Sequence, residues 1–196
     1  MKIFTWFFWL GIAICAGGAL AANASEPSSN LLEDIVENTR SKVTGFTAQD
    51  FQLRFNQAFH ENFKESEFKL DAKYKIASLE RWDGKTNDAM FFAMTSEQMA
   101  FLAALKKGTD EVKGITLISV LDDSIASSGD TLLVMGIVVE LFEPEAKQLG
   151  LGQMLIELVN GASSTPNKFT TKQLGNTKFS MMFSKDYGIL FSVEAA

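Results

Sequence analysis

The chain has 196 residues, of which 46% are hydrophobic and 21% charged, with a formal net charge of -6 and a pI of about 4.9. This composition is close to that of ordinary globular proteins and argues against collagen-like, disordered and multi-span membrane classes. The acidic balance, without a cluster of lysine or arginine, argues against nucleic-acid binding, because that affinity comes from basic residues that neutralise phosphates. One histidine and one cysteine leave little material for zinc sites or Cys/His catalysis.

Residues 1–24 have the pattern of a secretory signal peptide. Lys2 supplies a short basic region, residues 3–16 form an apolar run, and small residues then lead to an Ala-x-Ala cleavage site that ends at Ala24. The apolar run is shorter than the roughly 20 residues that a membrane-spanning helix needs. We therefore expect cleavage near Ala24 and a periplasmic or secreted bacterial protein with no stable membrane span afterwards.

Other fates of the N-terminus remain open. A second Ala-x-Ala site ends at Ala21, and an uncleaved membrane anchor is the alternative to cleavage. Lipidation at Cys15 is a further alternative, although the bulky Ile14 before it does not fit a lipoprotein signal. Cleavage at either site removes the single cysteine, which leaves a mature chain without disulfide or thiol chemistry, held together by its core.

Residues 25–45 are polar and acidic, and we expect a single domain over residues 46–196. The segment before the domain is interpreted as a tether or as a short docking helix around residues 31–36. A chain of this size buries roughly 70% of the surface that its unfolded form exposes. The domain therefore needs neither disulfides nor metal to be stable.

The first helix of the domain is expected to begin after Thr47. Thr47 is a favourable N-cap, Asp50 stands three positions later as in a capping box, and Phe46 precedes the cap as a hydrophobic staple against Phe51. Phenylalanine then recurs every four residues, at positions 51, 55, 59 and 63. This narrow apolar stripe predicts a helix that packs on a flat surface.

The next segments predict strands. Residues 68–76 alternate between apolar and charged side chains, as in a strand with one buried and one wet face. A second strand is expected at residues 89–94, after a polar loop. Residues 95–107 are ambiguous between a capped helix and a strand. The Lys-Gly-Thr-Asp-Glu sequence at residues 107–111 favours a hairpin that leads into a strand over residues 112–121.

The second half of the domain is expected to hold a helical pair followed by strands. Residues 131–142 are apolar on every side, as in a fully buried helix. A second helix follows Pro144, with a break at residues 150–152 and an end at residues 160–161. Three short strands are expected at residues 169–174, 178–184 and 189–194, with Gly188 at the left-handed position of the last turn.

Strands that occur in groups, rather than alternating with helices, indicate an α+β fold. The expected architecture is an antiparallel sheet with an N-terminal helix and a buried central helical pair packed on one face.

The sequence offers little catalytic or metal-binding chemistry. His60 is the only histidine and stands among charged neighbours, and no Gly-x-Ser-x-Gly motif of a hydrolase occurs. The loop at residues 83–88 lacks the glutamate that an EF-hand needs at its twelfth position, where Met94 stands. The Gly-Leu-Gly sequence at residues 150–152 is too short for a dinucleotide-binding motif. We therefore expect no catalytic residue, no metal and no cofactor.

These observations favour a non-enzymatic exported protein that binds a protein partner, as an inhibitor or an immunity-like protein does. Its acidic charge would speed association with a basic partner. The alternative is a small carrier of a lipid or another apolar molecule, with Phe51, Phe55, Phe59 and Met135 as candidate ligand-binding residues between helices and sheet. Packing of the core is the competing explanation for these four side chains.

A third hypothesis is an enzyme that uses carboxylates alone. It requires two or more of Asp83, Asp122, Asp123 and Asp130 to meet in a cleft. The chain has 24 acidic residues, so close pairs arise by chance and the sequence does not favour this hypothesis.

Overall fold

The computed structural model describes residues 46–65, 70–85, 87–120 and 125–195. The expected signal peptide, its cleavage site and the segment at residues 25–45 lie outside these ranges, as do Asp122 and Asp123. Expectations about them stay predictions.

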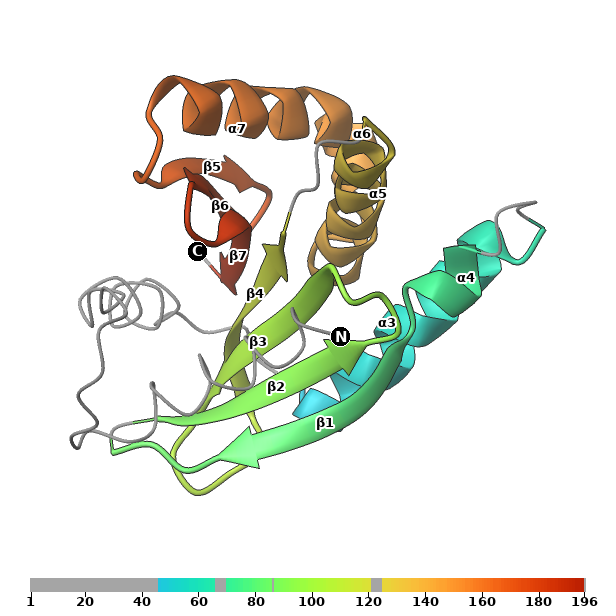
Figure 1. The fold of residues 1–196 in the computed structure, drawn as a ribbon, viewed down its shortest axis with the longest axis vertical. Coiled ribbons are helices and arrows are strands. Elements are labelled where there is room, and N and C mark those ends of the chain that lie inside the picture. The colour runs from blue at the N-terminus through green and yellow to red at the C-terminus, as the bar shows by residue number, and fades with distance from the viewer. Residues whose placement is uncertain (1–45, 66–69, 86, 121–124, 196) are drawn as a thin grey trace.

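The described strands form one antiparallel sheet in the order β1-β2-β3-β4-β7-β6-β5 (Figure 1). Two meanders are joined where β7 pairs with β4, and the helices α5 to α7 connect them along the chain. This arrangement confirms the α+β class. The elements are α3 (Ala48–Phe63), α4 (Leu70–Lys73), β1 (Ile76–Trp82), β2 (Asp88–Met94), β3 (Met99–Leu105), β4 (Val112–Ser119), α5 (Ile125–Phe142), α6 (Ala146–Leu149), α7 (Leu151–Ser164), β5 (Thr170–Leu174), β6 (Thr177–Ser184) and β7 (Gly188–Ala195).

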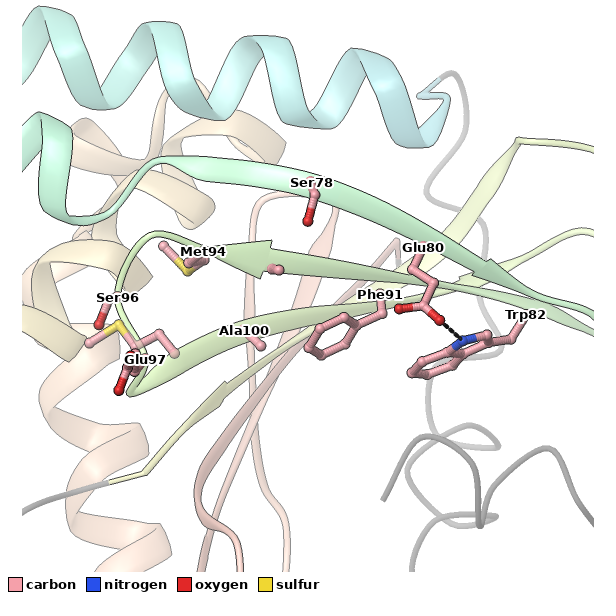
Figure 2. A pocket seen from close by; sticks show the side chains of 10 residues that line it. Ser78, Glu80, Trp82, Phe91, Met94, Ser96, Glu97 and Ala100 are labelled. Carbon is pink, nitrogen blue, oxygen red and sulfur yellow. Dashed lines mark hydrogen bonds between the residues drawn. The ribbon is translucent and has the colours of Figure 1, made fainter. Parts of the chain in front are cut away.

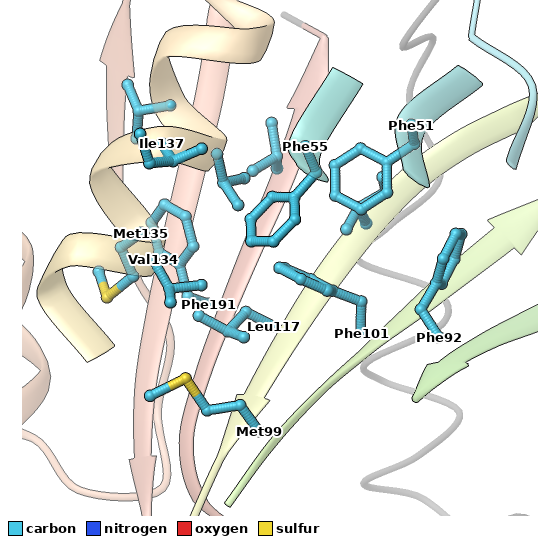
Figure 3. Packing of buried hydrophobic residues seen from close by; sticks show 14 of the residues in the cluster. Phe51, Phe55, Phe92, Met99, Phe101, Leu117, Val134, Met135, Ile137 and Phe191 are labelled. Carbon is cyan, nitrogen blue, oxygen red and sulfur yellow. The ribbon is translucent and has the colours of Figure 1, made fainter. Parts of the chain in front are cut away.

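The described helices share one core with one face of the sheet. Helix α3 packs behind the first meander, α7 packs on β5 and β6, and α5 lies between them in contact with α3 and β7 (Figure 1). Apolar side chains from all three helices meet those of the strands in a single cluster. Figure 3 shows the part of it in which α3 and α5 face the strands. A smaller cluster lies on the opposite side of the sheet, which we call the second face; its buried members are Leu102, Ile118, Met182, Tyr187 and Leu190.

Helix α3 begins as the sequence predicts. Thr47 Oγ1 accepts a hydrogen bond from the backbone N–H of Asp50 at 3.1 Å, and Asp50 Oδ2 accepts one from the backbone N–H of Thr47 at 3.2 Å, which completes the capping box. The phenylalanines at positions 51, 55 and 59 are buried. Phe46, expected as a staple against Phe51, places its ring edge-to-face on Phe142 of α5, with 5.3 Å between ring centroids.

The strand predicted at residues 68–76 is wrong over most of its length. Residues 66–69 lie outside the described residues, Leu70–Lys73 form the short helix α4, and β1 starts only at Ile76. An alternating pattern also places apolar residues four positions apart, which is the spacing of one helical turn. In this turn Tyr74 is buried, and its hydroxyl donates a hydrogen bond to Asp130 of α5.

Two details of the predicted helical pair are also wrong. Helix α5 is not buried on every side, because Leu132 and Leu133 are 41% and 39% exposed. Helix α7 runs past Gly161 to Ser164. A Cβ atom at position 161 would lie 2.4 Å from Cγ2 of Thr170 on β5, so this glycine lets the helix approach the sheet and does not end it.

The remaining elements agree with the sequence. Residues 95–107 contain strand β3 and the start of the hairpin to β4, as the turn sequence favours. Gly150 separates α6 from α7 with a φ of 94°, and Gly188 starts β7 with a φ of 78°. The three C-terminal strands lie within one or two residues of the predicted ranges.

The phenylalanine stripe of α3 yields a stability prediction. Phe55 is fully buried, so Phe55→Ala should lower the free energy of unfolding by about 3–5 kcal/mol through lost apolar contacts and a new cavity. Leu53 lies on the same helix but is 62% exposed, and Leu53→Ala should cost less than about 1 kcal/mol. Urea denaturation followed by circular dichroism measures both, and equal losses would contradict the packing described.

Candidate functional site

A groove lies on the second face of the sheet, over the first three strands (Figure 2). Its volume is about 90 Å³. Its floor and walls are mainly apolar, with polar groups toward the two ends. The lining residues are Ser78, Glu80 and Trp82 of β1, Phe91, Ala93 and Met94 of β2, Ser96 and Glu97 of the following turn, and Met99 and Ala100 of β3.

A β-bulge near the start of β1 sets which side chains reach the groove. Ile76 and Leu79 both pack toward the helices, although residues three positions apart point to opposite faces of a regular strand. The register shift between Ile76 and Ser78 corrects this. Figure 2 shows the result, since Ser78, Glu80 and Trp82 all point away from α3.

Register across the sheet assembles the rest of the site. Ser78 lies opposite Ala93, which in turn lies opposite Ala100, so two small side chains form a shallow floor. Glu80 lies opposite Phe91 in the neighbouring row. The groove is therefore a product of strand pairing between residues that are distant in sequence.

An aromatic wall closes one end of the groove. The rings of Trp82 and Phe91 stack with 5.6 Å between their centroids and an interplanar angle of 18°. Trp82 Nε1 donates a hydrogen bond to Glu80 Oε1 at 3.0 Å, which holds the carboxylate beside the rings. A group that binds in the groove therefore meets an apolar aromatic surface and, beside it, the fixed negative charge of Glu80.

The charged residues that line the groove are both acidic, Glu80 and Glu97, and both are exposed. Aromatic faces also attract cations through their negative ring quadrupole. The site therefore favours a group that combines an apolar body with a positive charge.

An ion-pair network fixes the end of β1 next to Trp82. Asp88 is buried and accepts from Lys107 Nζ at 2.6 Å, from Arg81 Nη2 at 2.6 Å and from the backbone N–H of Gly108 at 3.0 Å. The Lys107 bond, then those of Gly108 and Arg81, hold the pKa of the Asp88 carboxyl well below its usual range. This network ties the β1–β2 loop to the β3–β4 turn.

The candidate ligand-binding residues from the sequence lie elsewhere. Phe51, Phe55, Phe59 and Met135 are all buried in the core between the helices and the first face of the sheet. Figure 3 shows three of them, Phe51, Phe55 and Met135. Adjacent rings along α3 have centroids 5.9 Å and 5.5 Å apart. These contacts favour the core-packing explanation, and a ligand-binding role for the four residues stays a prediction.

The carboxylates considered for catalysis are dispersed where they are described. Asp83 is highly exposed near Arg81, whereas Asp130 pairs with Lys73 at 2.8 Å and accepts from Tyr74. Within the described ranges no three histidine, cysteine or acidic side chains gather as metal ligands. Nor does any helix there combine the length and apolar character of a membrane span.

Sequence reasoning missed the groove itself. The sequence predicts a polar loop before residue 89, whereas the structure makes Trp82 the last residue of β1; a tryptophan followed by Asp-Gly fits such a strand end. No protein-family model matches the chain, and the comparisons with curated proteins and with solved structures give no significant match.

The Asp88 network yields a pH-dependence prediction. Because the pKa of Asp88 is lowered on folding, its contribution to stability is fully present above the unfolded-state pKa of about 3.9 and is lost as the pH falls from there through the folded-state pKa. Asp88→Asn should therefore be less stable than the wild type at pH 7, and the gap should narrow below about pH 4.

Urea denaturation at several pH values measures this difference. Asp186→Asn serves as a control, because Asp186 is exposed and lies in the β6–β7 turn, away from the network. A gap between wild type and Asp88→Asn that stays constant down to pH 3 would show that Asp88 does not act through its charge.

Proposed function

We propose that the protein is an exported, non-enzymatic binding protein that holds a basic protein partner by taking one of its side chains into the groove on the second face. The role that fits is that of an inhibitor or an immunity-like protein. The observation that carries the proposal is the combination of a small apolar groove with the aromatic wall of Trp82 and Phe91 and the carboxylate of Glu80.

The size of the groove supports a side-chain anchor over a lipid or other apolar cargo. Small-molecule sites usually enclose about 300–1,000 Å³, and a dry cavity of about 150 Å³ can take up a molecule as small as benzene or xenon. The groove measures about 90 Å³, which suits the end of one side chain. The carrier hypothesis needs an enclosed space several times larger.

The chemistry of the groove supports a lysine or arginine as that side chain. The aliphatic stem of either residue buries well against apolar surface while its charged end stays near polar groups. Here the stem would contact Ala93 and Phe91, and the cation would lie near Glu80 and the Trp82 ring. The formal net charge of -6 would also raise the rate of association with a basic partner.

Capture from the native host tests this function. The full chain, expressed in its own host and crosslinked in place, should recover a protein partner in stoichiometric amount. Trp82→Ala should reduce that recovery by about tenfold or more, because aromatic anchors at the centre of an interface commonly contribute 2 kcal/mol or more. Glu80→Gln should reduce it by about fivefold, and raised salt should weaken the wild-type interaction.

Two control variants keep the result specific. Glu145→Gln makes the same chemical change on the helical side of the molecule, and Leu53→Ala removes an exposed apolar side chain there. Both should recover the partner as the wild type does. Failure to recover a stoichiometric protein, or equal recovery with all variants, would refute the proposed function.

A further inference from the structure

The strand that carries much of the groove is also the last strand of the described sheet. β1 pairs with β2 on one side, and no described strand pairs with its other side. An edge of this kind presents unpaired backbone N–H and C=O groups that can accept another strand. Ala77, Ser78 and Glu80 are exposed, as expected of an accessible edge.

Helix α3 occupies only the first residue of this edge. The side chain of Asn56 accepts from the backbone N–H of Ile76 at 2.8 Å and donates to its carbonyl at 3.1 Å, as a neighbouring strand would. Gln52 Nε2 donates to the same carbonyl at 3.3 Å. In the part of the chain that is described, no side chain bonds to the backbone of residues 77–82. Among the residues that the structure describes, the edge is therefore capped at its start and unpaired beyond it.

The charges on the second face indicate which kind of residue an added strand would place next to Glu80. On this face Lys178 of β6 lies opposite Glu194 of β7, with 3.3 Å between Nζ and Oε2. Opposite charges at such positions stabilise strand pairing. Glu80 also lies on the second face, but its neighbour on β2 is Phe91. Its carboxylate accepts from Trp82 Nε1, and none of the ion pairs among the described residues includes it. A basic residue on an added strand would complete the pair.

We propose that an extended, basic segment of the protein partner adds to the free edge of β1 as a further strand and places a lysine or arginine opposite Glu80, on the β1 side of the groove, from where the side chain extends across β1 toward Trp82 and Phe91. This inference rests on the proposed function and specifies the form of the partner. The backbone bonds of residues 77–82 supply affinity, and the groove with Glu80 and Trp82 supplies selectivity for a cationic side chain.

Peptides with the full chain test this inference. The probe is a capped peptide of alternating valine and threonine with one central arginine; its first comparison peptide carries citrulline, the neutral isostere, at that position. A second comparison peptide carries N-methyl groups on alternate backbone nitrogens, so that the side of the peptide that would pair with β1 has no N–H donors. Each is titrated up to about 1 mM. We expect about fivefold weaker binding with citrulline, because it loses the charge-assisted bond to Glu80. We expect about tenfold weaker binding with the methylated peptide, because it loses backbone hydrogen bonds to β1.

Amide hydrogen exchange locates the binding. The arginine peptide should slow exchange at alternate amides within residues 77–82 by tenfold or more. The amide of Ile76 already bonds to Asn56 and should not change. Strand β5, at the opposite edge of the sheet, should not change either. Slowed exchange at both edges, or at neither, would overturn strand addition at β1.

A charge exchange provides the decisive control. Glu80→Lys should lose the arginine peptide and gain a peptide that carries glutamate in its place, and Glu80→Gln should bind the arginine and citrulline peptides equally. Circular dichroism and urea denaturation confirm that both variants are folded. No binding by any peptide, or a wild type that binds arginine and citrulline equally, would overturn the inference. Host capture that still depends on Trp82 and Glu80 would in that case leave the proposed function standing, whereas its failure would remove both.

Discussion

Phe51 contacts aromatic rings from three other elements: Phe92 of β2, Phe101 of β3 and Phe142 of α5. The first two contacts are nearly perpendicular, with centroids 5.4 Å and 5.2 Å apart, which is a favourable geometry for aromatic pairs. One side chain thereby joins the first described helix to the first meander and to α5, the helix that follows the first meander along the chain. Phe46 on Phe142, and Tyr74 and Lys73 on Asp130, add further contacts between the same parts of the helical layer.

Covering one face with helices determines where a binding site can form. The core side of the first meander is packed by the α3 stripe, whose rings contact those of the strands. The groove therefore lies on the second face, where Ala93 and Ala100 leave a hollow between larger side chains. The bulge in β1 serves both sides, because it keeps Ile76 and Leu79 in the core while turning Ser78 and Glu80 outward.

Local signals predicted much of the fold. The capping box at Thr47, the phenylalanine spacing of α3 and the turn before Gly188 each depend on residues within a few positions, and each is found in the structure. The short helix α4 was missed because an alternating pattern also satisfies the spacing of a single helical turn. The end of α7 was missed because Gly161 serves a contact with Thr170, which is not visible from its own neighbours.

The same local signals did not predict the candidate site. Its residues come together only through strand register, which pairs Glu80 with Phe91 and Ala93 with Ala100. Alternation within one strand specifies which residues share a face, but turn geometry and pairing between strands decide which residue of the next strand lies opposite. Conversely, the phenylalanines proposed for ligand binding were conspicuous because they repeat, and repetition at helical spacing is the mark of a core stripe.

The Asp88 network has a consequence for recognition. The buried carboxylate of Asp88 bonds to Arg81 of β1 and to Lys107 and Gly108 of the β3–β4 turn. The end of the β1–β2 hairpin therefore cannot fray without breaking several bonds at once. An edge strand held in this way is already ordered before it meets another chain. On association, mainly the incoming segment then loses conformational entropy. Because the surface of the ordered strand does not change shape to fit poorly matched sequences, binding stays selective.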